Sequence, residues 1–452
     1  MTDSIATMPA SRWPGWLLAA LPGVLVGTVL LAAWPGYLSF DSAYQFWQAR
    51  TGEFGDVAPP LLPALWWLTL RLGLPDSSGP LLLIGLLYAA AFALLVLAAW
   101  RRGQPRLAAG LAVLGPLCPQ LLVLLPHVWT DVLLAGAALM AVGLLRALDT
   151  PRPWAVAAFG LLLLLVAALR HNGVFAAAPL LVWAALHWWP AANWRRRLLL
   201  VAAALVALVA MTNGLRSALI AQRLDTWAVT PLFDLQAVSV ARGEQRIPAA
   251  LAGAGLSVEE LREAFHPYSA TLLFAATRSG VHDPTLAPLA AAQRDALLDA
   301  WLALWREPAY WQHRGRLMRA LLGDFHGDTR GLADSPALTA YRDNPPLQWT
   351  YPALHAGYRS LVERLHGWRL YRTGTLALVA VLAVLLFARR RAQAERDAAL
   401  ALLGCAALYA APYAVLAPSS ELRYLLWPAM ACWLALQLVV FGPTARSGGN
   451  HS

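Results

Sequence analysis

Residues 80–100 read PLLLIGLLYAAAFALLVLAAW, and Arg101 and Arg102 follow directly. This stretch contains no charged side chain, and at 1.5 Å per residue a helix of its length crosses about 30 Å of hydrocarbon. Short basic flanks of such helices lie in the cytoplasm. The stretch therefore predicts a membrane-spanning helix whose carboxyl end faces the cytoplasm.

The composition of the whole chain is typical of a membrane-embedded protein. Of its 452 residues, 59% are hydrophobic and 13% are charged, whereas about a quarter of the residues of a soluble domain are charged. The formal net charge of +10 comes from arginines that lie mostly in short loops between apolar runs. This pattern is an orientation signal and not a nucleic-acid-binding face. We expect membrane lipids, and no nucleic acid, among the partners.

The apolar runs predict an all-α polytopic membrane protein with about ten transmembrane helices. The first run follows Arg12; it could be a signal peptide, but its length favours an uncleaved helix. The runs lie near residues 15–34, 80–100, 107–126, 128–147, 153–170, 174–190, 197–215, 372–389, 397–417 and 422–442.

Arginine clusters predict the orientation of these helices. Clusters occur at residues 101–106, 146–152, 195–197 and 389–396. All of them are cytoplasmic if the shorter run 59–74 does not span the membrane. If that run did span, the clusters would lie on the side opposite the N-terminus. We therefore expect residues 59–74 to form a helix on the outer face of a multi-pass protein of the bacterial inner (plasma) membrane.

The layout predicts three regions. An N-terminal transmembrane region covers residues 1–215 and includes a first outer loop at 35–79. Residues 216–370 have nearly balanced charge and helical periodicity, which predicts a small, mostly helical extracytoplasmic domain. A C-terminal transmembrane region covers residues 371–452.

Asp41 is the leading candidate for a catalytic residue. It follows Ser39 just beyond the first span, and Asp41, Tyr44, Gln45 and Gln48 have the spacing of one helix face. An acid with phenol and amide neighbours can act as a general base and hydrogen-bond a sugar or a similar polyol. The alternative is that Asp41 only caps the amino end of a helix.

Other candidates fall at the same outer rim, namely Asp131, Arg170, His171, Arg423 and Tyr424. Two arginines on a side where basic residues are disfavoured indicate an anionic partner such as phosphate. Bland alternatives stay open: a helix cap for the acid, a snorkelling side chain for the first arginine, and an ion pair with Glu421 for the second. No cofactor is indicated with certainty, and a divalent cation at His127 and a nearby acid is an open alternative.

The order of these features resembles the GT-C superfamily of polytopic glycosyltransferases, near the glycosyltransferase family 39 and aminoarabinose-transferase branch. The shared features are an outer-loop acid after the first helix, a Pro-Pro pair at Pro59 and Pro60, an acid in a later outer loop, and an Arg-Tyr pair before the last span. The resemblance covers about residues 15–215 and 372–442.

Two positions depart from the family pattern. Such enzymes often carry a second acid directly after the first, where this chain has Ser42. Asp56, further along the loop, is the expected substitute. Ala58 stands where a basic residue usually precedes the two prolines.

The resemblance implies transfer of a monosaccharide from a polyprenyl phosphate to a lipid, glycan or protein acceptor, in a site that faces the periplasm or cell exterior. Asp41 would deprotonate the acceptor hydroxyl, which then attacks the anomeric carbon with inversion. Arg170, His171 and Arg423 would stabilise the leaving phosphate. Asp131 would orient one of them or help to bind a metal.

Two other classes of function are rival hypotheses. A transporter or lipid flippase would perform no covalent chemistry, and the interruption Gly115–Pro119 inside one apolar run is a helix break of the kind that transporters use. However, the polar residues gather at one rim and not at mid-membrane, which favours the enzyme. An envelope assembly scaffold built around the outer domain is the third hypothesis.

Overall fold

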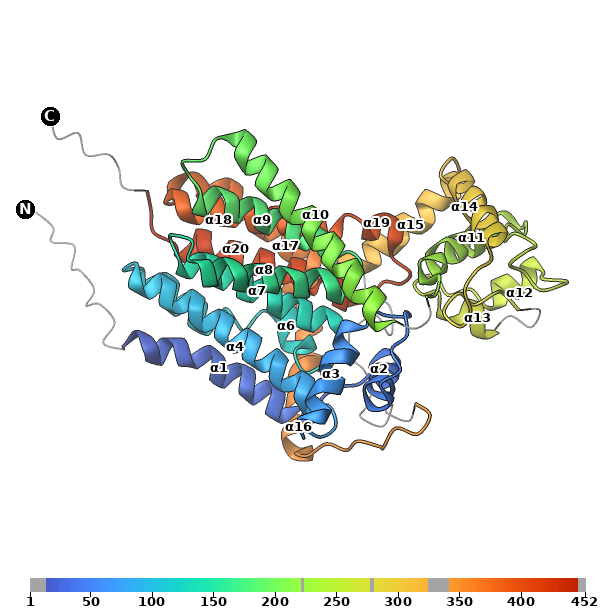
Figure 1. Ribbon diagram of the computed structural model, residues 1–452, viewed down its shortest axis with the longest axis horizontal. Coiled ribbons are helices and arrows are strands. Elements are labelled where there is room, and N and C mark those ends of the chain that lie inside the picture. Colours follow the sequence, from blue (N-terminus) through green and yellow to red (C-terminus); the bar gives the residue numbers. More distant parts are fainter. Residues whose placement is uncertain (1–13, 221–222, 277–279, 324–340, 446–452) are drawn as a thin grey trace, which may run out of the picture.

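The computed structural model describes residues 14–220, 223–276, 280–323 and 341–445, and within these ranges it contains helices, turns and isolated bridges but no strand (Figure 1). Most of the helices form one elongated bundle. The bundle consists of α1 (Gly15–Ala32), α4 (Ser78–Arg101), α5 (Pro105–Val113), α6 (Pro119–Leu124), α7 (Thr130–Ala147), α8 (Pro153–Leu169), α9 (Gly173–Trp188), α10 (Trp194–Leu219), α17 (Thr373–Phe387), α18 (Gln393–Ala410) and α20 (Leu426–Phe441).

The remaining helices lie toward one end of this bundle (Figure 1). They are α2 (Phe40–Thr51), α3 (Leu61–Arg71), α11 (Val229–Arg242), α12 (Val258–Glu263), α13 (Thr271–Ala276), α14 (Ala291–Leu304), α15 (Pro308–Leu322), α16 (Pro352–Leu365) and α19 (Tyr413–Leu416). Single 3-10 turns occur at Thr226–Ala228, Arg369–Tyr371, Ala388–Arg390 and Leu422–Leu425.

Seven helical segments in the described part of the chain are long and apolar enough to cross a membrane. They are the segments of α1, α4, α7, α10, α17, α18 and α20. The apolar helices α8 and α9 are shorter, with 17 and 16 residues. The multi-pass character predicted from the sequence agrees with this finding, whereas the count of ten spans stays a prediction.

The apolar run near residues 107–126 differs from the single helix that its hydropathy predicts. Pro116 and Pro119 interrupt it, because proline lacks the backbone N–H that a continuing helix needs, and the result is the pair α5 and α6. Side-chain hydrogen bonds tie the two sides of the break to other parts of the bundle. The Trp433 Nε1 donates to the Leu114 carbonyl at 2.7 Å, and the Gln120 Nε2 donates to the Tyr371 carbonyl at 2.8 Å.

The predicted arginine clusters gather at the end of the bundle away from α2 and α3. There the buried Arg146 on α7 pairs with Glu395 on α18 at 2.9 Å. Arg102 donates to the Arg146 carbonyl and pairs with Asp149. Arg391 donates to the Gly442 carbonyl at 2.6 Å, which joins the start of α18 to the end of α20. These contacts bring residues of the clusters at 101–106, 146–152 and 389–396 to one end of the bundle, whereas the side of the membrane on which they lie stays a prediction.

Residues 59–74, which we expect not to span, contain the helix α3 of 11 residues. At 1.5 Å per residue this helix is about 17 Å long, which is shorter than the hydrocarbon core. Trp66 anchors it: the indole is fully buried, stacks on Phe46 of α2 and donates to the Asp76 carbonyl at 2.6 Å. The helix therefore forms part of the packing around α2.

Residues 228–310 contain a hydrophobic core of their own. This core draws its buried side chains from α11, α12, α13, α14 and the start of α15, between Ala228 and Tyr310. Side chains further along the chain, among them Leu321, Tyr358 and Val362, belong to the large core of the bundle instead. The separately packed unit is thus smaller than the predicted domain 216–370.

Removing Glu395 should destabilise the fold. In Glu395→Ala the Arg146 guanidinium loses its partner while it stays buried, and the expected loss is about 3–5 kcal/mol in the free energy of unfolding. The control, Asp149→Ala, breaks an ion pair whose acid is 77% exposed, so its expected cost is below about 1 kcal/mol. Equilibrium unfolding in detergent micelles measures both, and equal losses would contradict this interpretation.

Candidate functional site

The start of α2 is fixed by serines and leaves Asp41 free of a capping role. Ser39 is the N-cap residue, and its hydroxyl accepts hydrogen bonds from the Ser42 backbone N–H at 3.5 Å and from the Trp129 Nε1 at 2.8 Å. The Ser42 hydroxyl donates to the Val128 carbonyl at 2.8 Å. The alternative that Asp41 serves as a helix cap is therefore wrong. Ser42, which replaces an expected acid, instead ties α2 to the start of α7.

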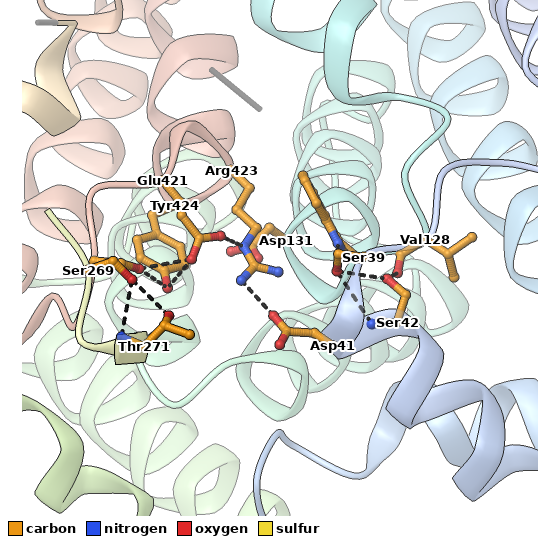
Figure 2. Close-up of polar contacts among 12 residues, drawn as sticks. Ser39, Asp41, Ser42, Val128, Asp131, Ser269, Thr271, Glu421, Arg423 and Tyr424 are labelled. Carbon is orange, nitrogen blue, oxygen red and sulfur yellow. Dashed lines mark hydrogen bonds and ion pairs between the residues drawn. The ribbon is translucent and has the colours of Figure 1, made fainter. Parts of the chain in front are cut away.

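Arg423 joins two acids at the centre of the site (Figure 2). Its Nη2 lies 2.6 Å from the Asp41 Oδ2, and its Nε pairs with Glu421. The guanidinium carbon lies 4.8 Å from the centroid of the Trp129 ring. The Arg423 side chain is 11% exposed and that of Asp41 is 50% exposed. A buried cation thus holds a carboxylate that an external molecule can reach.

Glu421 and Tyr424 form the far side of the same group. The Glu421 Oε1 accepts hydrogen bonds from the Ser419 hydroxyl at 2.8 Å and from the Tyr424 hydroxyl at 3.3 Å. The Tyr424 ring stacks on Tyr413 with centroids 5.2 Å apart. Arg423 therefore makes both of the contacts predicted for it, the ion pair with Glu421 and the approach to Asp41.

A second arginine approaches the same aromatic ring. Arg170 lies with its guanidinium carbon 4.8 Å from the Tyr424 centroid, while that of Arg423 lies 5.5 Å away. The Arg170 Nη1 is 3.3 Å from the Asp131 Oδ2, and Asp131 is 2% exposed. The residue at the N-cap position of α7 is Trp129 and not Asp131. The cap alternative for this acid is therefore also wrong, and its carboxylate instead faces Arg170.

Asp56 and His171 belong to an adjacent charged group. The Asp56 Oδ1 lies 2.6 Å from the Nη2 of Arg216, near the end of α10. His171 follows Arg170 directly and is influenced by the charges of both arginines and of Asp56. Desolvation by the surrounding chain and the charges of the two arginines lower the pKa of the imidazole to about 4, although part of the His171 surface is exposed. At neutral pH His171 is therefore an uncharged hydrogen-bonding group, not a third cation.

Two adjoining cavities open beside α10, and we call them together the α10 cavity. A polar one of about 400 Å³ and a more apolar one of about 270 Å³ share Asn213 and Arg216. The polar part is also lined by Asp56, Ser217, Ile220 and Arg223, and the apolar part by Pro59, Ala167, Ala168, Arg170, His171, Val174, Val209 and Thr212. This cavity is amphipathic, with Arg170 and Arg216 at the carboxyl ends of α8 and α10.

The sequence reasoning missed Arg216 and Arg223. Arg216 ends an apolar run on the expected outer side, where basic residues are disfavoured. An arginine at this position is the same sequence signal as Arg170.

The predicted face of α2 is only partly open. Gln45 and Gln48 are buried. Residues 52–58 fold back over α2, so that a Cβ on Gly55 would lie 2.5 Å from the Tyr44 hydroxyl. Tyr44 packs against Tyr341 with centroids 5.5 Å apart. The predicted helix is confirmed, but tertiary packing buries the amides of Gln45 and Gln48, away from the exposed Asp41.

His127 lies inside an aromatic stack. Its ring is fully buried, stacks on Tyr37 at 4.8 Å between centroids, and lies 4.3 Å from that of Trp129. Burial lowers the pKa of the imidazole to about 3. Among the described residues, no group of three or more His, Cys, Asp or Glu side chains could hold a metal ion. The residues around His127 therefore do not fit the divalent cation left open above.

No family model, curated protein or solved structure matches this chain.

The depressed pKa of His171 predicts an acid-dependent loss of stability. Its folded-state pKa of about 4 lies below the usual value near 6.5, so the unfolded chain binds more protons between these values. Stability from this group is complete above about pH 6.5 and declines as the pH falls toward 4, by less than the full pKa difference implies, because His171 is exposed and solvent screens its interactions with the arginines. Thermal unfolding at pH 7 and pH 4.5 should show a smaller pH effect for His171→Asn than for the wild type. An identical pH effect in both proteins would refute the assignment.

Proposed function

We propose that this protein is a glycosyltransferase of the bacterial inner membrane that moves a monosaccharide from a polyprenyl-phosphate donor to an acceptor hydroxyl. We further propose ten membrane passes, with the α2 end of the bundle and the outer domain on the extracytoplasmic side. One observation carries the proposal. The half-exposed Asp41 is held by the buried Arg423 at a rim that also carries Arg170 and the α10 cavity.

Asp41 acts as the general base. Arg423 occupies its Oδ2, which leaves the Oδ1 for the acceptor. The Oδ1 takes the proton of the acceptor hydroxyl as that oxygen bonds to the anomeric carbon on the face opposite the phosphate. The bond from the anomeric carbon to the phosphate oxygen breaks, its electron pair goes to the phosphate, and the configuration inverts. The leaving group is already an anion, so no strong general acid is needed.

The α10 cavity suits an amphiphile with an anionic head. Arg170 and Arg216 provide fixed positive charge for the phosphate, and the neutral His171 can donate one hydrogen bond to it. Cations already in place stabilise the charge on the departing phosphate without reorganisation. Only Leu208 of α10 is buried, so this helix has little packing that would keep a lipid chain away from the cavity.

Two observations favour the transferase over the transporter. The break at Gly115–Pro119 is buried, and the Trp433 and Gln120 side chains bond to backbone carbonyls around it. A transporter would use such a break to bind its cargo. In addition, the ion pairs of the bundle lie at its two ends, with Arg146–Glu395 at one and Arg423–Asp41 at the other.

Replacing the base should abolish transfer. Asp41→Asn keeps the size of the side chain but cannot accept the proton, so turnover should fall about 10²–10⁴-fold. The assay measures release of polyprenyl phosphate from labelled polyprenyl-phosphate hexoses and pentoses in proteoliposomes that contain a bacterial lipid extract as acceptor source. Near-normal turnover in the variant would disprove the role of Asp41.

The exposed Glu53 offers a matched control in the loop after α2. Glu53→Gln should retain full activity, and both variants should elute and melt like the wild type. Movement of labelled lipid across the bilayer without cleavage by the wild-type protein would replace the transferase proposal with the flippase.

Replacing Arg216 should weaken donor binding more than turnover. Arg216→Met removes one phosphate partner, so the KM for the donor should rise roughly tenfold or more while kcat changes less. Asp56→Asn, which retains Arg216, should change KM less than Arg216→Met does. Steady-state kinetics with the donor measures both. A fall in kcat at constant KM would contradict the placement of the phosphate.

A further inference from the structure

The loop before α20 is bound by the outer domain. Residues 417–421 connect α19 to the turn that carries Arg423. Three segments of the domain hydrogen-bond to this loop and to the end of α19. Two side chains donate to it, Arg314 Nη1 to the Ala417 carbonyl at 2.7 Å and the Thr230 hydroxyl to the Leu416 carbonyl at 3.0 Å. The backbone forms two more bonds, from the Ala270 N–H to the Pro418 carbonyl at 3.1 Å and from the Ser420 N–H to the Tyr268 carbonyl at 2.9 Å. The backbone just before Glu421 and Arg423 is thus held from outside the bundle.

Arg314 is the most constrained of these contacts. Its side chain is 2% exposed, and its Nη2 lies 2.5 Å from the Oδ2 of the fully buried Asp234. The same oxygen accepts a hydrogen bond from the Trp301 Nε1 at 2.7 Å. One side of the guanidinium is therefore anchored in the domain by α11 and α14, and the other side reaches the Ala417 carbonyl. The planar fork of arginine can hold two partners in this way, which a lysine ammonium cannot reproduce.

A buried ion pair is a weak source of stability, because desolvation of the two charges offsets their attraction. Here the pair is placed at the contact between the outer domain and the loop that leads to the candidate site. Arg314 lies on α15 and connects Asp234 of α11 to the carbonyl of Ala417. The pair therefore holds the backbone at Ala417 in a defined position relative to α11.

The helix that carries Asp41 is held by the same outer segment at a different point. The Asn344 Nδ2 donates to the Ala43 carbonyl at 2.8 Å, and Arg50 donates to the Asn344 Oδ1 at 3.0 Å. The Thr350 N–H donates to the Trp34 carbonyl at 3.0 Å. Residues from the 216–370 segment therefore contact both the α2 side and the α20 side of the Asp41–Arg423 pair.

We propose that Arg314, fixed by Asp234, is a positioning residue for Arg423. By holding residues 417–421 it sets the distance at which the Arg423 guanidinium meets Asp41 across the site. The outer domain then serves as a frame for the acid–cation pair. The effect on turnover rests on the proposed function, whereas the effect on the loop does not.

The test combines hydrogen exchange with kinetics on the full-length protein in nanodiscs. Arg314→Met preserves volume and removes both hydrogen bonds. Amide exchange in residues 417–424 should rise at least about tenfold, and by clearly more than in α14, because Asp234 loses its cation but keeps the hydrogen bond from Trp301 of α14. The kcat should fall with little change in the KM for the donor, since the α10 cavity is not touched. Arg242→Met, which breaks a surface ion pair with Glu307 in the same domain, is the matched control and should change neither.

Two further variants keep the test decisive if Arg314→Met folds poorly. Thr230→Val removes only the bond to the Leu416 carbonyl and should give a smaller rise in exchange in the same peptide. A disulfide introduced with S269C and S419C, at positions paired by an isolated bridge, should restore slow exchange to the Arg314→Met protein. It should also restore kcat to that of the S269C/S419C protein with Arg314 in place, which is the matched reference because the Ser419 hydroxyl donates to Glu421.

Unchanged exchange in residues 417–424, or an equal rise in α14, would overturn the positioning role. Failure of the disulfide to restore kcat while it restores slow exchange would also overturn it. If exchange responds as expected but the wild-type protein transfers no sugar, the frame stands and the proposed function falls.

Discussion

The buried guanidinium of Arg423 is the constraint on which the site depends. A cation that is largely withdrawn from water must be paired, and leaving it unpaired costs several kcal/mol. Its partners come from different parts of the chain: Asp41 from α2, Glu421 from the preceding loop, and the face of Trp129 at the start of α7. Satisfying this one charge therefore brings three elements together at one rim.

An arginine–carboxylate ion pair lies at each end of the bundle, and the two pairs differ in how exposed the carboxylate is. The Arg146–Glu395 pair is buried on both sides and joins α7 to α18, so its role is structural. The Arg423–Asp41 pair has one buried and one half-exposed member, so its acid can meet a substrate. The difference lies in the exposure of the carboxylate, not in the strength of the ion pair.

The α10 cavity and the domain whose core is formed by residues 228–310 both adjoin the site that contains this pair. The cavity puts Arg170 and Arg216 beside an apolar slot, where we propose that the lipid phosphate binds. The domain binds the loop before Arg423 through Arg314, and its own core is separate from that of the bundle. A site whose acid and cation come from different helices needs such external support, because a small shift would separate them.

Local sequence determined the membrane class, most of the long helices and the rim on which the polar residues gather. Hydropathy and arginine placement are properties of single segments, and Asp41, Arg170 and Arg423 were all found in that way.

Tertiary structure alone decided which groups meet. Arg423 and Asp41 pair across 382 residues, the amides of Gln45 and Gln48 turn inward, and Arg314 reaches across to the loop at Ala417. Helical spacing defines a face of α2 but not what covers that face. Only the packing of distant segments determines whether an acid there is buried, paired or open to a substrate.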